Sequence, residues 1–415
     1  MTSLIIAAAI ISLAGHLAIW ITFWNHTQGR AMPMWLLDSI SLLAQACCGI
    51  VPFLTALVLI SPEFHGPVRY GVFCYLGLCF LTGIVGFPIT FLRRRQRRRA
   101  RCGVRTETSR IVKSDRARSV SSRADVGPLT RLLIQLPSNQ SFEIEVNQKE
   151  LTIPRLPAAL DGLRVAHISD LHYTGKVDRS FFHDAVDIVN ESCPDLIAIT
   201  GDLVDDIRYL PWIAPTMGRL RAKLGTFAIL GNHDCKLSLP TIRRTLSESG
   251  ISPLSGRIEK HEVAGTEIVL ASNELPWIAP ASDPEELVRY SDETSLRILL
   301  AHSPDVFPWA KRYDFDLMLA GHTHGGQFCI PGFGPFVCPS RLPLDYTSGT
   351  IFEAPTMLHV SRGLSAEVPL RLNCRPELTC LELRSESKNL PFAAQAVGTE
   401  QAIGTEFVDF AQTEV

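Results

Sequence analysis

Hydrophobic residues are concentrated in three long uncharged stretches at the N-terminal end of the chain. Residues 4–24, 39–60 and 70–92 form stretches of 21, 22 and 23 residues without a single charge. An α-helix needs about 20 apolar residues to cross the hydrocarbon core of a bilayer. The pattern therefore predicts a membrane domain over residues 1–92 with three transmembrane helices. Helices buried in a soluble core are the alternative interpretation.

A strongly basic segment follows the third stretch. Residues 93–101 contain seven arginines. The positive-inside rule places such a run on the cytoplasmic side, where it can also contact anionic headgroups. We therefore predict a multi-pass protein of the inner or plasma membrane, with its N-terminus outside and its catalytic domain in the cytoplasm. Residues 93–128 are rich in Arg, Ser and Thr, which predicts a basic flexible linker.

Beyond the linker, the apolar runs become short, and each ends in a polar cluster. The runs are LRVAHISDLH, DLIAITGDLVDD, TFAILGNHD, LRILLAHSPD and FDLMLAGHTHGG, with helix-like stretches between several of them. Strands that alternate with helices predict a layered α/β domain, which we expect over residues 129–383. Ligands bind beyond the carboxyl ends of strands in such folds. Residues 384–415 lack periodicity and are predicted to be a loose C-terminal tail.

The charges are divided unevenly along the chain. Residues 92–125 carry 13 basic and 3 acidic residues, which leaves 27 basic and 39 acidic residues elsewhere. Because phosphate contacts require Lys and Arg, an acidic globular part argues against a nucleic-acid partner. The 11 cysteines form no CxxC pair, so a disulfide framework or a cysteine-based zinc site is not expected. An odd number of unpaired cysteines fits a reducing compartment.

The polar clusters contain the residue types that bind transition metals. The candidates are Asp170, His172, Asp202, Asn232, His233, Asp234, His302, His322 and His324. Each is weak evidence alone, because strand ends often carry capped or solvated polar residues. Five of the 12 histidines lie in these clusters, together with several acidic residues, which is hard to explain by chance. Carboxylate, amide oxygen and imidazole ligands suit Zn, Mn or Fe.

The motifs D-x-H, GD, GNHD, the histidine of AHSPD, and GHTH have the order and spacing of a known family. Over residues 163–383 the sequence resembles the calcineurin-like metallophosphoesterases. GHTHGGQ, SRGL and the final NCRPELTCLEL resemble the membrane-linked bacterial branch. That branch includes manganese-dependent phosphodiesterases and one type of UDP-2,3-diacylglucosamine pyrophosphatase. SRGLS departs from the branch, which usually has a final glycine there, but it touches no expected ligand.

The resemblance implies a sandwich of two mixed β-sheets flanked by helices, with two divalent metal ions (Mn, Zn or Fe) at the sheet ends. It assigns one metal to Asp170, His172, Asp202 and His324. It assigns the other to Asp202, Asn232, His302 and His322. His233 carries over as a histidine that binds no metal and acts on the leaving-group side, and Asp234 would fix its tautomer.

These observations predict a membrane-anchored dinuclear-metal phosphoesterase. The expected substrate is a phosphodiester or pyrophosphate of a lipid or of a lipid-linked nucleotide such as a UDP-diacylglucosamine. A phosphodiesterase for soluble nucleotides is an alternative, and so is a non-catalytic membrane scaffold. No P-loop motif and no G-x-S-x-G motif occur, so an NTPase or a serine hydrolase has no support. The sequence does not indicate an oligomeric state.

Overall fold

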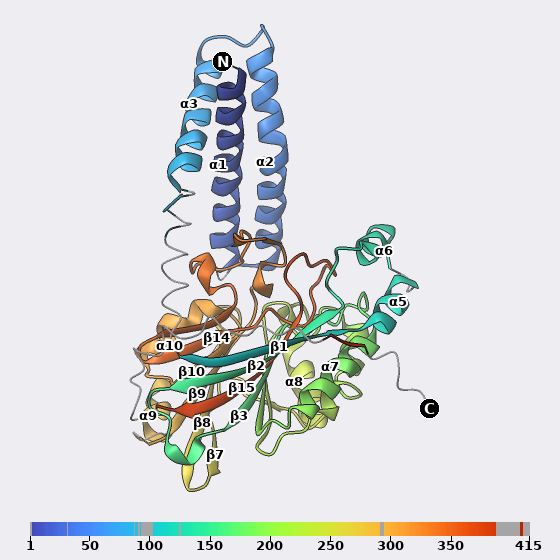
Figure 1. Ribbon diagram of the computed structural model, residues 1–415, viewed down its shortest axis with the longest axis vertical. Coiled ribbons are helices and arrows are strands. Elements are labelled where there is room, and N and C mark those ends of the chain that lie inside the picture. Colours follow the sequence, from blue (N-terminus) through green and yellow to red (C-terminus); the bar gives the residue numbers. More distant parts are fainter. Residues whose placement is uncertain are drawn as a thin grey trace. The chain divides into compact units, whose positions relative to one another are not determined.

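The computed structural model describes residues 2–30, 32–86, 88–89, 92, 103–123, 126–290, 294–386 and 407–409. The chain divides into two compact units (Figure 1). One comprises residues 1–100 with 339–341, and the other comprises residues 101–338 with 342–415. The arginine run at 93–101, on which the predicted orientation depends, lies outside the described residues.

The N-terminal unit consists of apolar helices. They are α1 (Thr2–Gln28), α2 (Met34–Ile60) and α3 (Pro67–Leu81), which continues into the π-helical turn η1 (Thr82–Gly86). Three segments are long and apolar enough to cross a membrane: Ser3–Gln28, Trp35–Ile60 and Pro67–Gly86. The prediction of three helices that could span a membrane is therefore confirmed.

Two glycines allow α1 to lie close to the segment formed by α3 and η1. A Cβ atom at Gly15 would lie 1.8 Å from the carbonyl oxygen of Cys79, and one at Gly83 would lie 2.4 Å from that of Ile11. Small residues let membrane helices approach each other at the backbone. A larger side chain at either position would force these helices apart.

The second unit contains two large sheets. The first has the strand order β16 (Phe407–Asp409), β1 (Val104–Lys113), β2 (Glu143–Ile153), β15 (Glu377–Ser385), β3 (Arg164–Ile168), β4 (Leu196–Thr200), β5 (Gly225–Ile229), β6 (Ser252–Pro253). The second has the order β13 (Gly349–Glu353), β14 (Thr356–Val360), β10 (Leu317–Ala320), β9 (Leu296–Ala301), β8 (Thr266–Asn273), β7 (Glu259–Val263). Both sheets mix parallel and antiparallel pairs, as expected.

Helices cover the outer faces of both sheets. The α-helices of this unit are α5 (Asp115–Arg123), α6 (Pro128–Gln135), α7 (Arg179–Glu191), α8 (Leu239–Glu248), α9 (Pro284–Tyr290) and α10 (Phe307–Arg312). A central core joins side chains of the two sheets, such as Val165 and Leu319. Phe181 of α7 and Ile242 of α8 extend a second core on the first sheet, and Phe307 of α10 belongs to a third core on the second sheet. The predicted α/β sandwich is confirmed.

The prediction of a flexible linker over residues 93–128 is wrong for much of that segment. β1 pairs antiparallel with β2, with one irregularity between Val104 and Thr106, and lies next to it in the first sheet (Figure 1). Ile111 and Val112 of β1 are buried. The sequence shows few apolar residues here because the rest of β1 is half-buried or exposed, so its stability comes from the ladder with β2 rather than from its own hydrophobicity.

The predicted tail also needs correction at two points. Residues 384 and 385 belong to β15, and Phe407–Asp409 pairs in parallel with β1. The remainder of the predicted tail after residue 386 lies outside the described residues.

Candidate metal centre

The polar residues that follow five strands meet at one edge of the two sheets. β3 leads to Asp170 and His172, β4 to Asp202, β5 to Asn232, β9 to His302, and β10 to His322 and His324. β3, β4 and β5 are parallel neighbours, as are β9 and β10, so their carboxyl ends lie at a common edge. The fold thereby gathers residues that are up to 154 positions apart, as counted from Asp170 to His324.

Several of these residues have a backbone conformation that residues other than glycine rarely adopt. The φ angle is positive, between 44° and 70°, at Asp170, His172, Asp202, His322 and His324. Residues held in the left-handed region cost free energy and concentrate at functional sites. Of the 11 non-glycine residues with a positive φ angle in the described part of the chain, five are candidate ligands.

A first cluster contains four of the predicted ligands. One ligand atom from each of Asp170, His172, Asp202 and His324 lies within 4.8 Å of the others. His172 Nε2 is 3.6 Å from Asp202 Oδ2. His324 Nε2 is 3.6 Å from Asp170 Oδ1. These are the four residues that the resemblance assigns to one metal.

A second cluster shares a member with the first. Atoms of Asp202, His302 and His322 lie within 4.8 Å of one another. His302 Nε2 is 3.2 Å from Asp202 Oδ2 and 3.1 Å from the side-chain oxygen of Asn232. Asp202 therefore stands where a carboxylate could bridge two cations. The structure brings the predicted ligands together, and their binding of metal stays a prediction.

Three of the histidines are held through Nδ1, which directs Nε2 into the clusters. His302 Nδ1 lies 2.7 Å from the carbonyl oxygen of Thr200, and His324 Nδ1 lies 3.2 Å from that of Ser365. His172 Nδ1 lies 2.7 Å from an Asp205 carboxylate oxygen. Such partners fix the tautomer and the ring orientation of metal-binding histidines. The donor set and its supports therefore fit a pair of divalent cations.

Asp205 also holds His233, a role that the sequence did not predict. His233 Nδ1 is 2.5 Å from Asp205 Oδ1, while the other oxygen of Asp205 takes His172. Burial opposes ionisation of Asp205, but His172 and His233 outweigh it and hold the pKa of the carboxyl well below its usual range. One carboxylate thus links a candidate ligand to the candidate acid.

The prediction that Asp234 fixes the tautomer of His233 is wrong. Asp234 is fully buried, and its Oδ1 accepts hydrogen bonds from the backbone N–H groups of Leu203 and Val204, both at 3.0 Å. Its Oδ2 accepts from the N–H of Gly231 at 2.8 Å. Asp234 therefore ties the loop after β5 to the loop after β4. Adjacent residues of a tight loop point in different directions, so sequence adjacency to His233 was misleading.

Burial and the carboxylates act in opposite directions on the candidate ligands. Burial disfavours protonated His172, but Asp205 and Asp202 outweigh it and raise its pKa to about 9. Burial also disfavours protonated His302, but the carboxylates, mainly Asp202, outweigh it and raise the pKa of His302 to about 9. Burial opposes ionisation of Asp202, yet His302 and the other histidines hold its pKa well below the usual value. A divalent cation that binds here would displace these protons.

Several known proteins have sequences similar to this chain. The family model for calcineurin-like phosphoesterases matches residues 163–326. The metallophosphoesterase YkuE of Bacillus subtilis is 30% identical over 248 residues, which cover 58% of this chain and 86% of that protein. This chain belongs to the calcineurin-like phosphoesterase family.

Two other relatives bear on activity and on the membrane. The phosphodiesterase YaeI of Escherichia coli is 32% identical over 225 residues, which cover 53% of this chain and 82% of that protein. The transmembrane protein with metallophosphoesterase domain of Danio rerio is 31% identical over 255 residues, covering 57% and 56% of the two chains. As a calcineurin-like phosphoesterase, this chain is a metal-dependent hydrolase of a family with a dinuclear divalent-metal site. The predicted enzyme class is thereby confirmed.

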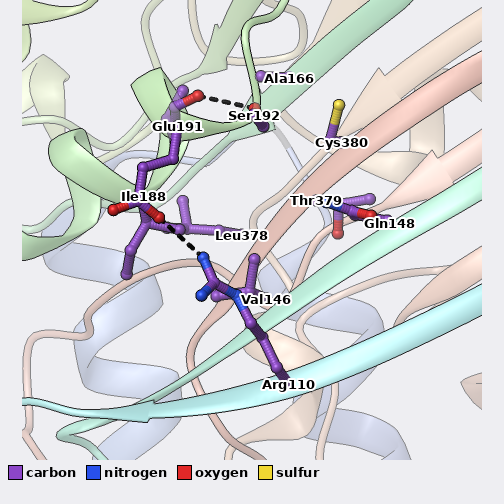
Figure 2. Close-up of a pocket in the computed structure, with 11 residues that line it drawn as sticks. Arg110, Val146, Gln148, Ala166, Ile188, Glu191, Ser192, Leu378, Thr379 and Cys380 are labelled. Atoms are coloured by element: carbon purple, nitrogen blue, oxygen red, sulfur yellow. Dashed lines mark hydrogen bonds and ion pairs between the residues drawn. The ribbon is translucent and has the colours of Figure 1, made fainter. Parts of the chain in front are cut away.

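A separate cavity of about 170 Å³ lies between α7 and the first sheet (Figure 2). Its lining residues are Arg110, Val146, Gln148, Ala166, Ile188, Val189, Glu191, Ser192, Leu378, Thr379 and Cys380. Arg110 Nη2 and Glu191 Oε2 form an ion pair of 3.0 Å in it. The cavity contains none of the candidate ligands of this calcineurin-like phosphoesterase, so it is not the reaction site.

Proposed function

We propose that this protein is a membrane-anchored dinuclear-metal phosphodiesterase that hydrolyses a phosphodiester or pyrophosphate bond of a lipid or lipid-linked nucleotide. The observation that carries the chemistry is the sharing of Asp202 between two clusters, with the His233–Asp205 pair beside them. A UDP-diacylglucosamine is the substrate class that the sequence resemblance suggests. Manganese, zinc and iron all suit the donors.

In this proposal each group has one task. When bound, two divalent cations lower the pKa of a water molecule and polarise the phosphoryl oxygens. The two clusters hold the cations, and no serine or cysteine nucleophile is required. Asp205 occupies Nδ1 of His233, so Nε2 is the atom that can donate a proton to the departing alkoxide. The His233 side chain is 18% exposed, against 0% for His302, which supports a role facing the substrate.

A lysine beside His233 adds a cationic group to the site. Lys236 Nζ lies 3.0 Å from His233 Nδ1, and the carboxylates of Asp205 and Glu367 pair with it at 3.5 Å and 3.7 Å. Lys176 Nζ donates to the backbone oxygen of Glu367 at 2.7 Å. Cationic groups near a cleft raise the local concentration of phosphorylated substrates. A cationic group at Lys236 suits a phosphorylated substrate, either a lipid or a soluble nucleotide.

The apolar helices favour a membrane substrate. Chemistry on a soluble phosphodiester needs no bilayer anchor, whereas an amphiphilic substrate in the same leaflet would meet the enzyme at a high effective concentration. The arginine run supports a cytoplasmic catalytic unit and would add about 1 kcal/mol of attraction per basic residue near anionic lipid. We therefore propose a multi-pass protein with its active site at the inner leaflet. Hydrolysis of soluble nucleotides is the second candidate.

Surface dilution tests the substrate. The full-length protein is reconstituted with Mn²⁺ into liposomes that contain a fixed bulk amount of UDP-diacylglucosamine, and inert phospholipid is then added. We expect the rate to fall as the mole fraction of substrate in the surface falls. Hydrolysis of soluble bis(p-nitrophenyl) phosphate by the same liposomes should not change. A rate unaffected by dilution, or no turnover of lipid-linked substrates beside good turnover of soluble nucleotides, would favour the second candidate.

A further inference from the structure

Two cysteines from distant parts of the sequence meet beside the turn that carries His324. Cys329 lies in the short strand β11 (Cys329–Ile330), and Cys374 lies in the loop before β15. The two sulfurs converge on one backbone group, because each lies 3.5 Å from the carbonyl oxygen of Gly325. Neither of these two cysteines forms a disulfide in the structure.

The backbone holds the two cysteine-bearing segments together independently of the sulfurs. Phe328 and Leu372 form a parallel β-bridge. The N–H of Cys329 donates to the Leu372 oxygen at 2.9 Å, and the Asn373 amide donates to the Cys329 oxygen at 3.0 Å. The thiols are therefore kept close, which is the main geometric requirement for a disulfide.

The same sulfurs support a candidate metal ligand. Cys374 Sγ donates to the carbonyl oxygen of His324 at 3.3 Å. Gly325 has φ of +62°, and a Cβ there would lie 2.7 Å from Cys374 Sγ, so the sulfur packs directly against this turn. The buried side chain of Arg371 contacts the same residue, with Nη1 3.4 Å from the His324 oxygen. A change at Cys374 therefore acts on the backbone of the turn that carries His324.

We propose that Cys329 and Cys374 are a thiol modification site. Reversible disulfide formation there weakens metal binding at the first cluster, through His324. The oxidant is a low-molecular-weight disulfide. Cys329, the more exposed thiol, attacks it and releases one small thiol, leaving a mixed disulfide. Cys374 then attacks the Cys329 sulfur and releases the second small thiol. Two protein thiols are oxidised while one small disulfide is reduced to two thiols, so electrons and protons balance.

Closure changes the turn in two ways. The sulfurs must approach to about 2.05 Å, and both S–H donors to the Gly325 and His324 oxygens are lost. Cys374 contacts the backbone of His324 and not its ring, so closure would weaken cation binding by shifting the turn. Changes around metal-binding histidines typically alter affinity or activity by about 10- to 100-fold. This consequence rests on the proposed dinuclear centre, whereas the cross-link itself does not.

The test uses full-length, manganese-loaded protein treated with oxidised glutathione and then with a dithiol. Non-reducing peptide mass spectrometry should find a Cys329–Cys374 cross-link, with about one metal lost per chain and activity at least about 10-fold lower. The dithiol and added Mn²⁺ should restore both. Cys329→Ser should resist oxidation, whereas Cys193→Ser, which removes an exposed cysteine elsewhere, should behave like the wild type.

Three results would overturn the proposal. The first is the absence of the cross-link at excess oxidant. The second is an equal loss of activity in Cys329→Ser and wild type. The third is a complete cross-link that leaves metal content and activity unchanged. A protein without phosphodiesterase activity could still form the cross-link, so failure of the proposed function can be told apart from failure of this inference.

Discussion

Replacing Asp205 with asparagine should damage metal binding and catalysis with little change in the fold. The carboxylate of Asp205 serves His172 at 2.7 Å and His233 at 2.5 Å, one with each oxygen. Asparagine has nearly the same shape but only one acceptor oxygen, so one of the two Nδ1–H groups would face an amide N–H. That ring must then turn or change its tautomer.

The size of the effect follows from these two bonds. Loss of a carboxylate partner typically weakens metal binding through a histidine by about 10- to 100-fold, which corresponds to about 1.4 to 2.8 kcal/mol. Loss of a general acid typically costs about 10²- to 10⁴-fold in rate. Saturating Mn²⁺ compensates for the weaker metal binding. The decrease in kcat of Asp205→Asn should then report the effect on His233.

The matched control is Asp234→Asn, the same substitution at the residue that the sequence had favoured. In the contacts described above, Asp234 accepts hydrogen bonds only from backbone N–H groups. Its substitution should therefore leave a buried donor unpaired and cost about 1 to 3 kcal/mol of stability. Metal titration, bis(p-nitrophenyl) phosphate hydrolysis at saturating Mn²⁺, and urea unfolding separate the two variants. The reasoning is refuted if Asp234→Asn loses kcat while Asp205→Asn keeps it.

Three further results are expected. Burial lowers the pKa of His167 to about 3, so the folded protein keeps this residue neutral while the unfolded chain takes up a proton below its ordinary value of 6.5. The stability that neutral His167 gives the folded protein is therefore complete above about pH 6.5 and is lost as the pH falls toward 3. At pH 5 the loss in the free energy of unfolding is about 2 kcal/mol. Urea unfolding of His167→Gln should show a flatter pH dependence than that of the wild type. Because the pKa values of His172 and His302 are raised to about 9, metal loading at pH 7 should release protons, so calorimetric enthalpies measured in two buffers of different ionisation enthalpy should differ; equal enthalpies would contradict this. A reporter fused at the C-terminus should be active only if it is of a type that works in the cytoplasm, and activity of a periplasmic reporter would reverse the proposed orientation.

The candidate ligands were predictable because each follows an apolar run that could only be a buried strand. Once parallel strands share a sheet edge, residues such as Asp170, Asp202 and His302 must converge there. Their grouping into two sets came from the family resemblance, and the distances around Asp202 agree with it.

Asp205 was missed because nothing in GDLVDD distinguishes its second acidic residue from a solvated loop carboxylate. Only the folded loops reveal that it lies between His172 and His233, which come from different strand ends. β1 was missed for a different reason. Its stability lies in hydrogen bonds to β2, a partner that begins 30 residues after the end of β1 and that local composition cannot reveal.

The metal content of Asp202→Ala tests the central claim most directly. Asp202 is the one residue common to both clusters, so the dinuclear proposal predicts about two divalent ions per chain in the wild type and in His233→Ala, but at most one in Asp202→Ala. Metal analysis of the three purified full-length proteins after Mn²⁺ loading gives the answer, with phosphodiesterase activity lost in both variants. Two ions retained by Asp202→Ala, or equal loss of metal from His233→Ala, would contradict a dinuclear centre bridged by this carboxylate.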